Sequence, residues 1–296
     1  MQDFEYVAPT SVAEVISLLE NGGDQSRVLV GGTDLIVQLR EGRRSARTVV
    51  DIKRVPEVNE LSFQEGAGLT IGAAVSCAQI CEHPQVAALY PGLVDAVSLI
   101  GGTQVQGRAS VGGNLCNASP AADTAPALIA HRAVCVIAGP NGRREIPVED
   151  FFSGPGRNVL GPAEILLSIR VPAPTAGFGG YYLRFIPRNE MDIAVVGAGA
   201  AVWLGEDGQY FQSVRLALGA VAPTPLLVVS VEEFLSGAEV LPENIRQASL
   251  LAREAARPIS DMRGTAEQRK HLSGVLARRA LEGALERARA GLRIPA

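Results

Sequence analysis

The stretch VLVGGTDL at residues 28–35 decides how the rest of the chain is interpreted. A short apolar run, typical of a buried strand, leads into Gly31-Gly32, and LIVQLR at 35–40 then has helical spacing. A strand that ends in glycines and opens a helix leaves backbone N–H groups free around one point, which suits a phosphate. The stretch lacks the Lys-Ser/Thr ending of a P-loop and the G-x-G-x-x-G spacing of a Rossmann turn. An ordinary strand-to-helix turn would explain the same residues.

A second glycine-containing stretch, ASVGGNLCNASPAAD at 109–123, carries the groups that a dinucleotide needs. Gly112-Gly113 expose further N–H groups, and the Asp123 carboxylate can accept from a ribose hydroxyl or an adenine amine. The segment 100–123 is too rich in Gly, Ser and Asn for a regular element, so we expect a long ordered loop. The alternative is a structural loop whose Asn and Ser side chains satisfy their own backbone.

Length and composition exclude several classes of protein. The 296 residues suffice for one large domain or two ordinary ones, and 47% hydrophobic with 20% charged residues is typical of a folded globular chain. The 27 basic and 31 acidic residues give a net charge of −4, which supplies no field for holding nucleic acid. No apolar run reaches the roughly 18 residues of a membrane span, and MQDFEYVAPT is not a signal sequence, so we expect a cytoplasmic protein.

The cysteines and histidines indicate neither a metal site nor acid–base chemistry. No CxxC pair is present, so we expect packed thiols at Cys77, Cys81, Cys116 and Cys135. The histidines are isolated from one another, and we expect structural or solvent-facing roles for His83, His131 and His271.

The first part of the chain alternates helices and strands. Thr10-Ser11 caps a helix over VAEVISLLE, and 76–100 contains two helical stretches broken near Pro84 and Pro91. Asn141-Gly142 is a hairpin turn. Further strands are predicted at 49–52, 69–73, 133–138 and 164–172, with a short helix at 124–130.

The segment PAPTAGFGG at 172–180 is the best domain boundary in the sequence. We expect a first domain at 1–176, with lobes of about 1–54 and 55–176, and a second at 177–296. In the second domain, three antiparallel strands within 181–221 precede helices at 242–256 and 265–290, an α+β arrangement. The last helix presents either a solvated charged face or a docking face through Arg269, Lys270, Arg278, Arg279, Arg287 and Arg289.

GGTDL and SVGGNLCNASPAAD together closely resemble the two FAD-binding signatures of the flavoprotein (medium) subunits of molybdenum hydroxylases, the xanthine dehydrogenase and carbon monoxide dehydrogenase family. The resemblance continues through EDFFSGPGRNVLGPAEILLSIRVP, PRNEMDIAVVGAGAAV, LALGAVAPTP and PISDMRGTAEQRKHLSGVLARRAL, and so covers nearly the whole chain. It implies a two-lobed α+β FAD-binding domain of the p-cresol methylhydroxylase type, followed by a small C-terminal α+β domain with an antiparallel sheet and helices.

The resemblance also implies which residues bind FAD. Residues 28–35 match the first pyrophosphate loop, 100–103 begin the second stretch near the flavin, and Arg184 stands where the family more often has Lys. Asp192 is expected to be structural. The expected cofactor-binding residues are Val28, Leu29, Val30, Gly31, Gly32, Thr33, Asp34, Leu35, Ile100, Gly101, Gly102, Thr103, Ser110, Val111, Gly112, Gly113, Asn114, Asp123, Leu166 and Arg184.

By the same resemblance, the chain is the FAD-carrying, electron-transfer subunit of a heterotrimeric molybdenum hydroxylase, an oxidoreductase. It lacks ferredoxin-type cysteine spacing and any molybdopterin-like segment, so these cofactors belong to partners: a molybdopterin-containing large subunit and a small subunit with 2Fe-2S clusters. Electrons would pass to NAD or a quinone-type acceptor. The alternatives are a stand-alone FAD-dependent oxidase or dehydrogenase, and a non-catalytic dinucleotide-binding assembly protein. We expect no catalytic acid or base and no metal ligand in this chain.

Overall fold

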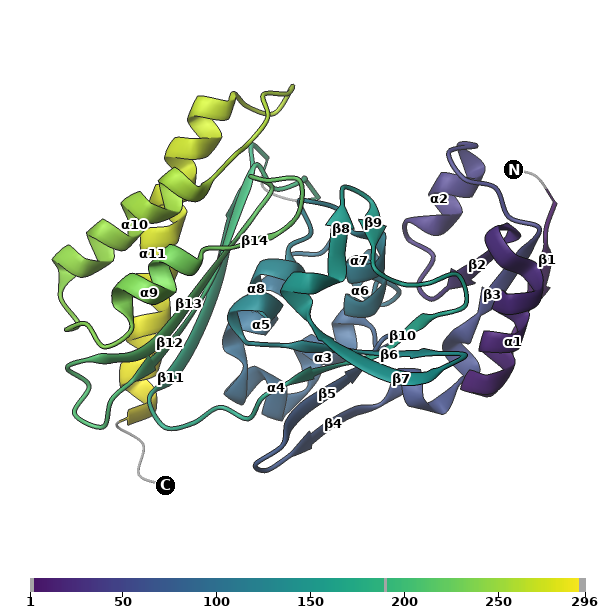
Figure 1. Ribbon diagram of the computed structural model, residues 1–296, viewed down its shortest axis with the longest axis horizontal. Helices are drawn as coiled ribbons and strands as arrows, with labels where there is room; N and C mark the ends of the chain where they lie inside the picture. The colour runs from purple at the N-terminus through teal and green to yellow at the C-terminus, as the bar shows by residue number, and fades with distance from the viewer. Residues whose placement is uncertain (1–2, 189–190, 293–296) are drawn as a thin grey trace.

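A small parallel sheet forms the N-terminal lobe of the computed structural model, which describes residues 3–188 and 191–292 (Figure 1). Its order is β1 (Glu5–Val7), β3 (Thr48–Asp51), β2 (Ser26–Leu29). Helix α1 (Val12–Gly22) begins as predicted at Ser11, whose side chain accepts a hydrogen bond from the Glu14 N–H. After β2 the chain turns through 30–34 into α2 (Leu35–Arg40), so the predicted order of strand, glycine turn and helix is confirmed.

The second sheet is antiparallel and has five strands. Its order is β4 (Leu61–Gln64), β5 (Gly68–Gly72), β10 (Ile165–Val171), β6 (Val134–Gly139), β7 (Gly142–Pro147). Six helices connect β5 to β6: α3 (Cys77–Glu82), α4 (Pro84–Leu89), α5 (Pro91–Val97), α6 (Thr103–Gln106), α7 (Val111–Asn117) and α8 (Thr124–Ala130). The 3-10 helices at 52–54, 56–59 and 148–151 and the short pair β8 (Phe152–Gly154) and β9 (Arg157–Asn158) complete this part.

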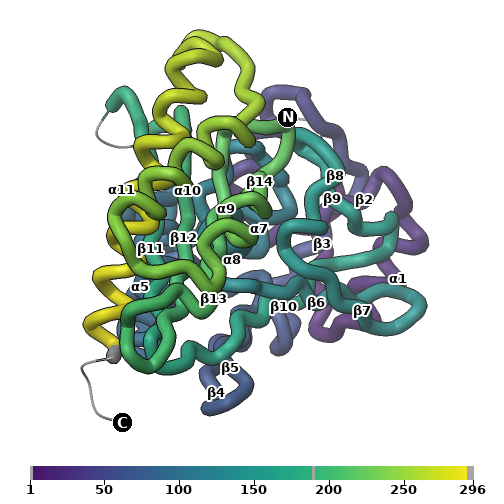
Figure 2. The backbone as a smooth tube through the Cα atoms, turned by 60° about the vertical axis from the view of Figure 1, so that its left-hand side comes forward, coloured from purple at the N-terminus to yellow at the C-terminus, as the bar shows by residue number. Residues whose placement is uncertain are grey.

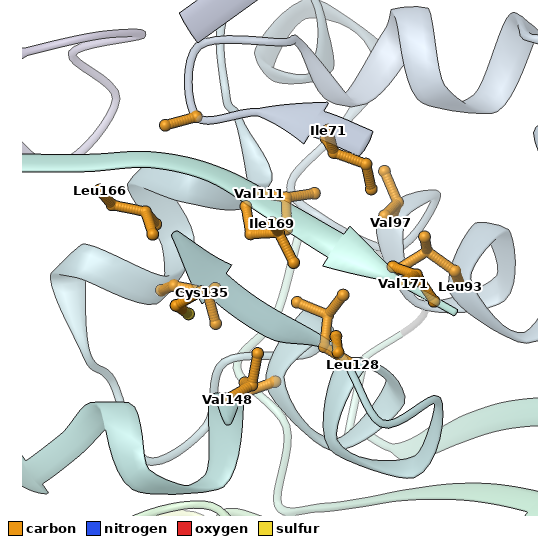
Figure 3. Packing of buried hydrophobic residues seen from close by; sticks show 14 of the residues in the cluster. Ile71, Leu93, Val97, Val111, Leu128, Cys135, Val148, Leu166, Ile169 and Val171 are labelled. Atoms are coloured by element: carbon orange, nitrogen blue, oxygen red, sulfur yellow. The ribbon is translucent and has the colours of Figure 1, made fainter. Parts of the chain in front are cut away.

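The main core lies between this sheet and its helices. Figure 3 shows Ile71 of β5, Ile169 of β10 and Cys135 of β6 meeting Val111 of α7 and Leu128 of α8. All five side chains are fully buried. The helix that opens at residue 111 is thereby anchored in the core through its first apolar side chain.

The third sheet has four antiparallel strands in chain order: β11 (Phe178–Phe185), β12 (Val196–Leu204), β13 (Phe211–Gly219) and β14 (Leu226–Leu227). Helices α9 (Val229–Leu235), α10 (Pro242–Ala255) and α11 (Ala266–Leu292) lie on one face of this sheet (Figures 1 and 2). Helices α5 and α8 of the preceding part cover the other face. The three predicted neighbouring strands are confirmed, and the sheet is buried between two helical layers.

The expectation that 100–123 is a loop without regular structure is wrong. The segment contains α6 and α7, and α7 is capped by Ser110, whose Oγ accepts from the Gly113 N–H at 3.0 Å. A Cβ at Gly112 would lie 2.5 Å from the Ala73 carbonyl oxygen. The glycine is therefore required because the helix packs directly on another backbone, a tertiary contact that overrides its poor helix propensity.

The helical region at 76–100 contains three helices rather than the two expected. Pro84 opens α4 and Pro91 opens α5, and each occupies the first helical position. A proline at that position loses no hydrogen bond, because the first N–H groups of a helix have no partner within it. The prolines therefore separate three short helices.

Two of the six basic residues expected on the outer face of α11 make internal contacts instead. Arg269 is only 4% exposed and donates to the carbonyl oxygens of Val195 and Ala220. It also forms an ion pair with Asp261 at 2.6 Å. Arg287 pairs with Asp95 on α5 at 2.5 Å. Helical spacing could not reveal this, because the strands and helices they contact are distant in sequence.

Within residues 3–188 and 191–292, none of the helices combines the length and apolar composition that crossing a bilayer requires. All four cysteines are free, and burial raises the pKa of Cys77 to about 12, so this thiol is packed as expected. The boundary predicted at 176/177 falls in the connection between β10 and β11 and stays a prediction.

His131 provides a titratable group at the contact between α8 and β11. Its Nδ1 donates to the Ala127 carbonyl at 2.7 Å, whereas its Nε2 has no partner among the described residues. A Cβ at Gly180 would overlap His131 Nε2 and lie 2.7 Å from Cε1, so β11 packs directly against the ring. Burial lowers the pKa of His131 from 6.5 to about 4, although the Ala127 bond and the Asp95 carboxylate oppose the shift.

We predict that His131 makes the chain lose stability in mild acid. Because the folded-state pKa lies below the unfolded one, the unfolded chain binds the proton first, and stability present above pH 6.5 falls progressively down to about pH 4. Relative to His131→Gln, the wild-type free energy of unfolding should fall by roughly 1.4 kcal/mol per pH unit in this window. Urea unfolding at each pH measures it, with exposed His271→Gln as the control. Parallel profiles for wild type and His131→Gln would contradict the prediction.

Candidate cofactor-binding site

A cavity of about 270 Å³ lies between the N-terminal lobe and the five-stranded sheet with its helices. One wall is the end of β2, the turn 30–34 and the start of α2, and the other is the first turn of α7 with the beginning of β10. The predicted residues that line it are Val28, Val30, Gly31, Gly32, Thr33, Asp34, Leu35, Ile100, Ser110, Gly112, Gly113, Asn114 and Leu166. Both glycine stretches therefore face one cavity.

The two stretches touch through their backbones. A Cβ at Gly31 would overlap the carbonyl oxygen of Arg108 and lie 2.6 Å from the carbonyl carbon. Such distances are far below van der Waals contact, so only glycine permits this approach. The turn after β2 is consequently seated against the residues that precede Ser110, and the two motifs form one site.

The first turn carries backbone donors without a protein acceptor. Among the described residues, none accepts a hydrogen bond from the N–H of Gly32, Thr33 or Asp34. The carbonyl of Gly32 accepts from the Ile36 N–H at 3.1 Å and so starts α2. Because these three residues line the cavity, their N–H groups are available to an anionic ligand within it.

Side-chain amides connect the two walls. Gln38 Nε2 of α2 donates to Asn117 Oδ1 of α7 at 3.2 Å. Asn114 Oδ1 accepts from Thr124 Oγ1 at 2.6 Å, which orients the Asn114 amide on the cavity wall. Asn158 donates to the Cys116 carbonyl at 2.9 Å. These bonds join helices α2, α7 and α8 to the short strand β9 around the site.

The cavity contains more positive charge than its motifs predict. Arg27 and Arg44 line it, and neither forms an ion pair with any described residue. The carboxylate of Glu164 is already held by Arg144 at 2.7 Å, and the hydrogen bond from Arg144 lowers its pKa. Burial raises the pKa of Asp34, with Arg43 opposing the shift. Two guanidinium groups without an ion pair among the described residues suit a diphosphate.

Sequence reasoning missed part of this lining, most of which carries no motif, although Ala109, Cys116 and Asn117 belong to the second glycine-containing stretch. Arg27 precedes the glycine turn in the β2 strand, and Arg44 lies in the arginine-rich segment after α2, where the spacing indicates only a solvated loop. The lining residues outside the predicted set are Arg27, Gln38, Arg44, Ile52, Ala73, Ala109, Cys116, Asn117, Asn158, Leu160, Glu164 and Ile165.

Asp123 and Arg184 lie outside the cavity lining and contact each other. Arg184 Nη1 donates to Asp123 Oδ2 at 2.6 Å, and the Tyr182 hydroxyl donates to Asp123 Oδ1 at 2.7 Å. The two charged side chains are only 6% and 10% exposed. Burial raises the pKa of Asp123, while Arg184 and Tyr182 oppose the shift. Their direct contact with a cofactor stays a prediction.

The other predicted residues outside the lining occupy two places. Leu29 and Val111 point into hydrophobic cores. Gly101, Gly102 and Thr103 form the turn that opens α6, directly after Ile100 of the lining. Asp192, expected to be structural, accepts from its own neighbour's N–H and pairs with Arg188 at 3.3 Å.

Two family models match the chain. Residues 2–174 match the FAD-binding domain in molybdopterin dehydrogenase, and residues 181–284 match the C-terminal domain of the carbon monoxide dehydrogenase flavoprotein. Together they cover the same two parts of the chain that contain the cavity and the third sheet.

Similar proteins span the chain almost end to end. The carbon monoxide dehydrogenase medium chain of Hydrogenophaga pseudoflava is 34% identical, covering 96% of this chain and 98% of its own. A putative xanthine dehydrogenase FAD-binding subunit of Escherichia coli (strain K12) is 31% identical over 96% and 97%. Among solved structures, carbon monoxide dehydrogenase from Hydrogenophaga pseudoflava superposes with a TM-score of 0.92 at 32% identity, covering 97% and 98%. Quinoline 2-oxidoreductase from Pseudomonas putida 86 has a TM-score of 0.88 at 27% identity, covering 98% and 99%.

We predict that Gly31→Ala disrupts the site. The added methyl group meets the Arg108 backbone, which cannot rotate away as a side chain can, so the free energy of unfolding should fall by roughly 1–3 kcal/mol. Urea denaturation of the full chain measures this loss. Gly107→Ala is the matched control, because its Cβ meets nothing within 4 Å and the residue has an ordinary φ of −67°. Equal stability of the two variants would show that the loops do not meet as described.

We also predict that Arg184→Met destabilises the protein, because it leaves the buried Asp123 carboxylate without its ion-pair partner. Removing one partner of a buried pair should lower the free energy of unfolding by roughly 3–5 kcal/mol at pH 8. The loss should shrink at pH 5, because protonation removes the charge that the missing guanidinium compensated. Denaturation at both pH values measures this, and Asp123→Asn added to Arg184→Met should restore part of the stability. A loss independent of pH would mean that packing, rather than charge, connects the two residues.

Proposed function

The chain belongs to the family of FAD-carrying (medium) subunits of molybdenum hydroxylases, and from this premise we propose that it relays electrons from 2Fe-2S clusters of a partner subunit to NAD or a quinone-type acceptor. Membership makes it an oxidoreductase subunit with FAD as its cofactor. The relay and its acceptor are the proposed part. The chain's own residues would hold and orient FAD, because the redox chemistry resides in the cofactor.

The observation that carries the proposal is the convergence of the two glycine stretches on one cavity. The free N–H groups of 32–34 and the guanidinium groups of Arg27 and Arg44 are donors suited to a diphosphate. Ile52, Ile100 and Leu166 provide apolar wall for ring systems. The donor set therefore fits a molecule that joins a diphosphate to flat aromatic groups, as FAD does. When bound, FAD supplies the two-electron chemistry that no side chain here can.

The lining supports an electron-transfer role over a stand-alone oxidase or dehydrogenase. Such an enzyme needs a general base over the substrate. In the part of the chain that the structure describes, no histidine or tyrosine lines the cavity, and Glu164 is engaged by Arg144 and the Gly161 N–H. The other lining carboxylate, Asp34, belongs to the glycine turn that we propose binds the diphosphate. We propose that substrate oxidation takes place elsewhere, on a partner.

We propose two partner subunits, a large one with molybdopterin and a small one with 2Fe-2S clusters. The solved relatives include a Cu,Mo-containing carbon monoxide dehydrogenase, which is 29% identical and has a TM-score of 0.91. Within residues 3–188 and 191–292, no group of three or more His, Cys, Asp or Glu side chains is arranged to hold a metal ion. The donor chemistry for a molybdenum or iron centre would therefore come from other chains.

We predict that the full chain binds one FAD and that this FAD is reduced only through partners. The chain should acquire flavin absorbance on incubation with FAD, and nucleotide released by heat should be FAD. Substrate should then bleach the flavin in the co-purified complex and leave the isolated chain unchanged. Bleaching of the isolated chain would favour the stand-alone dehydrogenase. Absence of flavin binding would favour the non-catalytic assembly protein.

A further inference from the structure

A lysine outside both glycine stretches contacts the first of them. Lys53 lies in the 3-10 helix 52–54 that follows β3, and its ammonium donates to the Val30 carbonyl at 2.9 Å. The same ammonium forms an ion pair with Asp51 Oδ1 at 2.7 Å. Val30 is the residue directly before Gly31. Lys53 therefore connects the end of β3 to the entrance of the glycine turn.

The anchor of this lysine is itself fixed. Asp51 Oδ1 accepts the backbone N–H of Lys53 at 3.0 Å, and Asp51 Oδ2 accepts the Tyr6 hydroxyl at 2.5 Å. The Asp51 side chain is only 9% exposed. Although burial raises its pKa, hydrogen bonds from Lys53 and Tyr6 lower it overall, so the carboxylate remains ionised near neutrality. Strands β1 and β3 together hold the Lys53 ammonium in place.

Holding the Val30 carbonyl also orients the next N–H group. The Val30 carbonyl and the Gly31 N–H belong to one planar trans peptide and point in opposite directions. Glycine has no side chain to restrict this peptide, so the orientation needs an external contact. Lys53 supplies it, and no described residue accepts from the Gly31 N–H. Val30 and Gly31 both line the cavity.

We propose that Lys53 is a positioning residue for the cofactor: by holding the Val30 carbonyl, it directs the Gly31 N–H toward the diphosphate of bound FAD. The inference rests on the proposed FAD site and adds a residue that neither glycine stretch contains. Lys53 acts on the Gly31 N–H through the single peptide group that joins Val30 to Gly31. Lys53 accordingly determines how well the turn is organised before the cofactor arrives.

The test compares FAD and ADP binding to the full chain and to Lys53→Met by isothermal titration calorimetry. Methionine keeps the aliphatic stem and removes the donor and charge. The dissociation constants for FAD and ADP should both rise about tenfold, since both ligands carry the diphosphate that a fixed N–H would meet. Lys53→Arg, which keeps a cationic donor, should recover at least half of the lost affinity on a logarithmic scale. A merely structural role would lower the unfolding temperature without changing the two dissociation constants together.

The matched control is Lys270→Met on α11, outside the cavity lining, which should bind FAD as the wild type does. If Lys53→Met does not fold, Asp51→Asn provides a second measurement, because it weakens the anchor and keeps the lysine. A loss of FAD affinity of threefold or more in that variant supports the inference, and unchanged affinity overturns it. A wild-type chain that binds no FAD refutes the proposed function itself. A wild-type chain that binds FAD with the same affinity as Lys53→Met refutes only the role of the lysine.

Discussion

The contact between the backbone of Gly31 and that of Arg108 is the constraint on which the site depends. With any side chain at residue 31, the turn after β2 would be displaced from the segment that precedes α7. The two segments meet at their backbones, and both line the cavity. Free N–H groups on one wall and the capped start of α7 on the other then face a common space.

The third sheet is connected to one wall of the cavity through side chains of β11. Side chains alternate along β11, so Tyr182 and Arg184 share the face that α5 and α8 cover. Both donate to Asp123, which directly precedes Thr124, and Thr124 in turn donates to Asn114 on the cavity wall. Hydrogen bonds on either side of the Asp123–Thr124 peptide thus connect the C-terminal sheet to the cavity wall. The two parts of the chain are therefore connected, even though the cavity itself lies in the first.

Ion pairs between elements distant in sequence hold this arrangement. Arg287 of α11 reaches Asp95 of α5, and Arg215 of β13 reaches Glu149 and the Ile129 carbonyl. Each guanidinium is at most 30% exposed. Helical spacing assigns Arg287 to the charged outer face of α11, yet its guanidinium connects two helices within the molecule. The charges on the third sheet and on α11 therefore contribute to the attachment of the C-terminal part.

The sequence by itself determined the strand-turn-helix order around Gly31, the three antiparallel strands after residue 177 and the family, because these depend on local patterns and short motifs. It could not reveal α7 as a helix, since the glycines at 112 and 113 disfavour a helix and the packing of Gly112 on the Ala73 backbone is a tertiary contact. It also could not place Arg44 at the cavity or Lys53 against Val30. Only the tertiary structure decided those contacts, because side chains that meet across elements carry no signal in the spacing of either element alone.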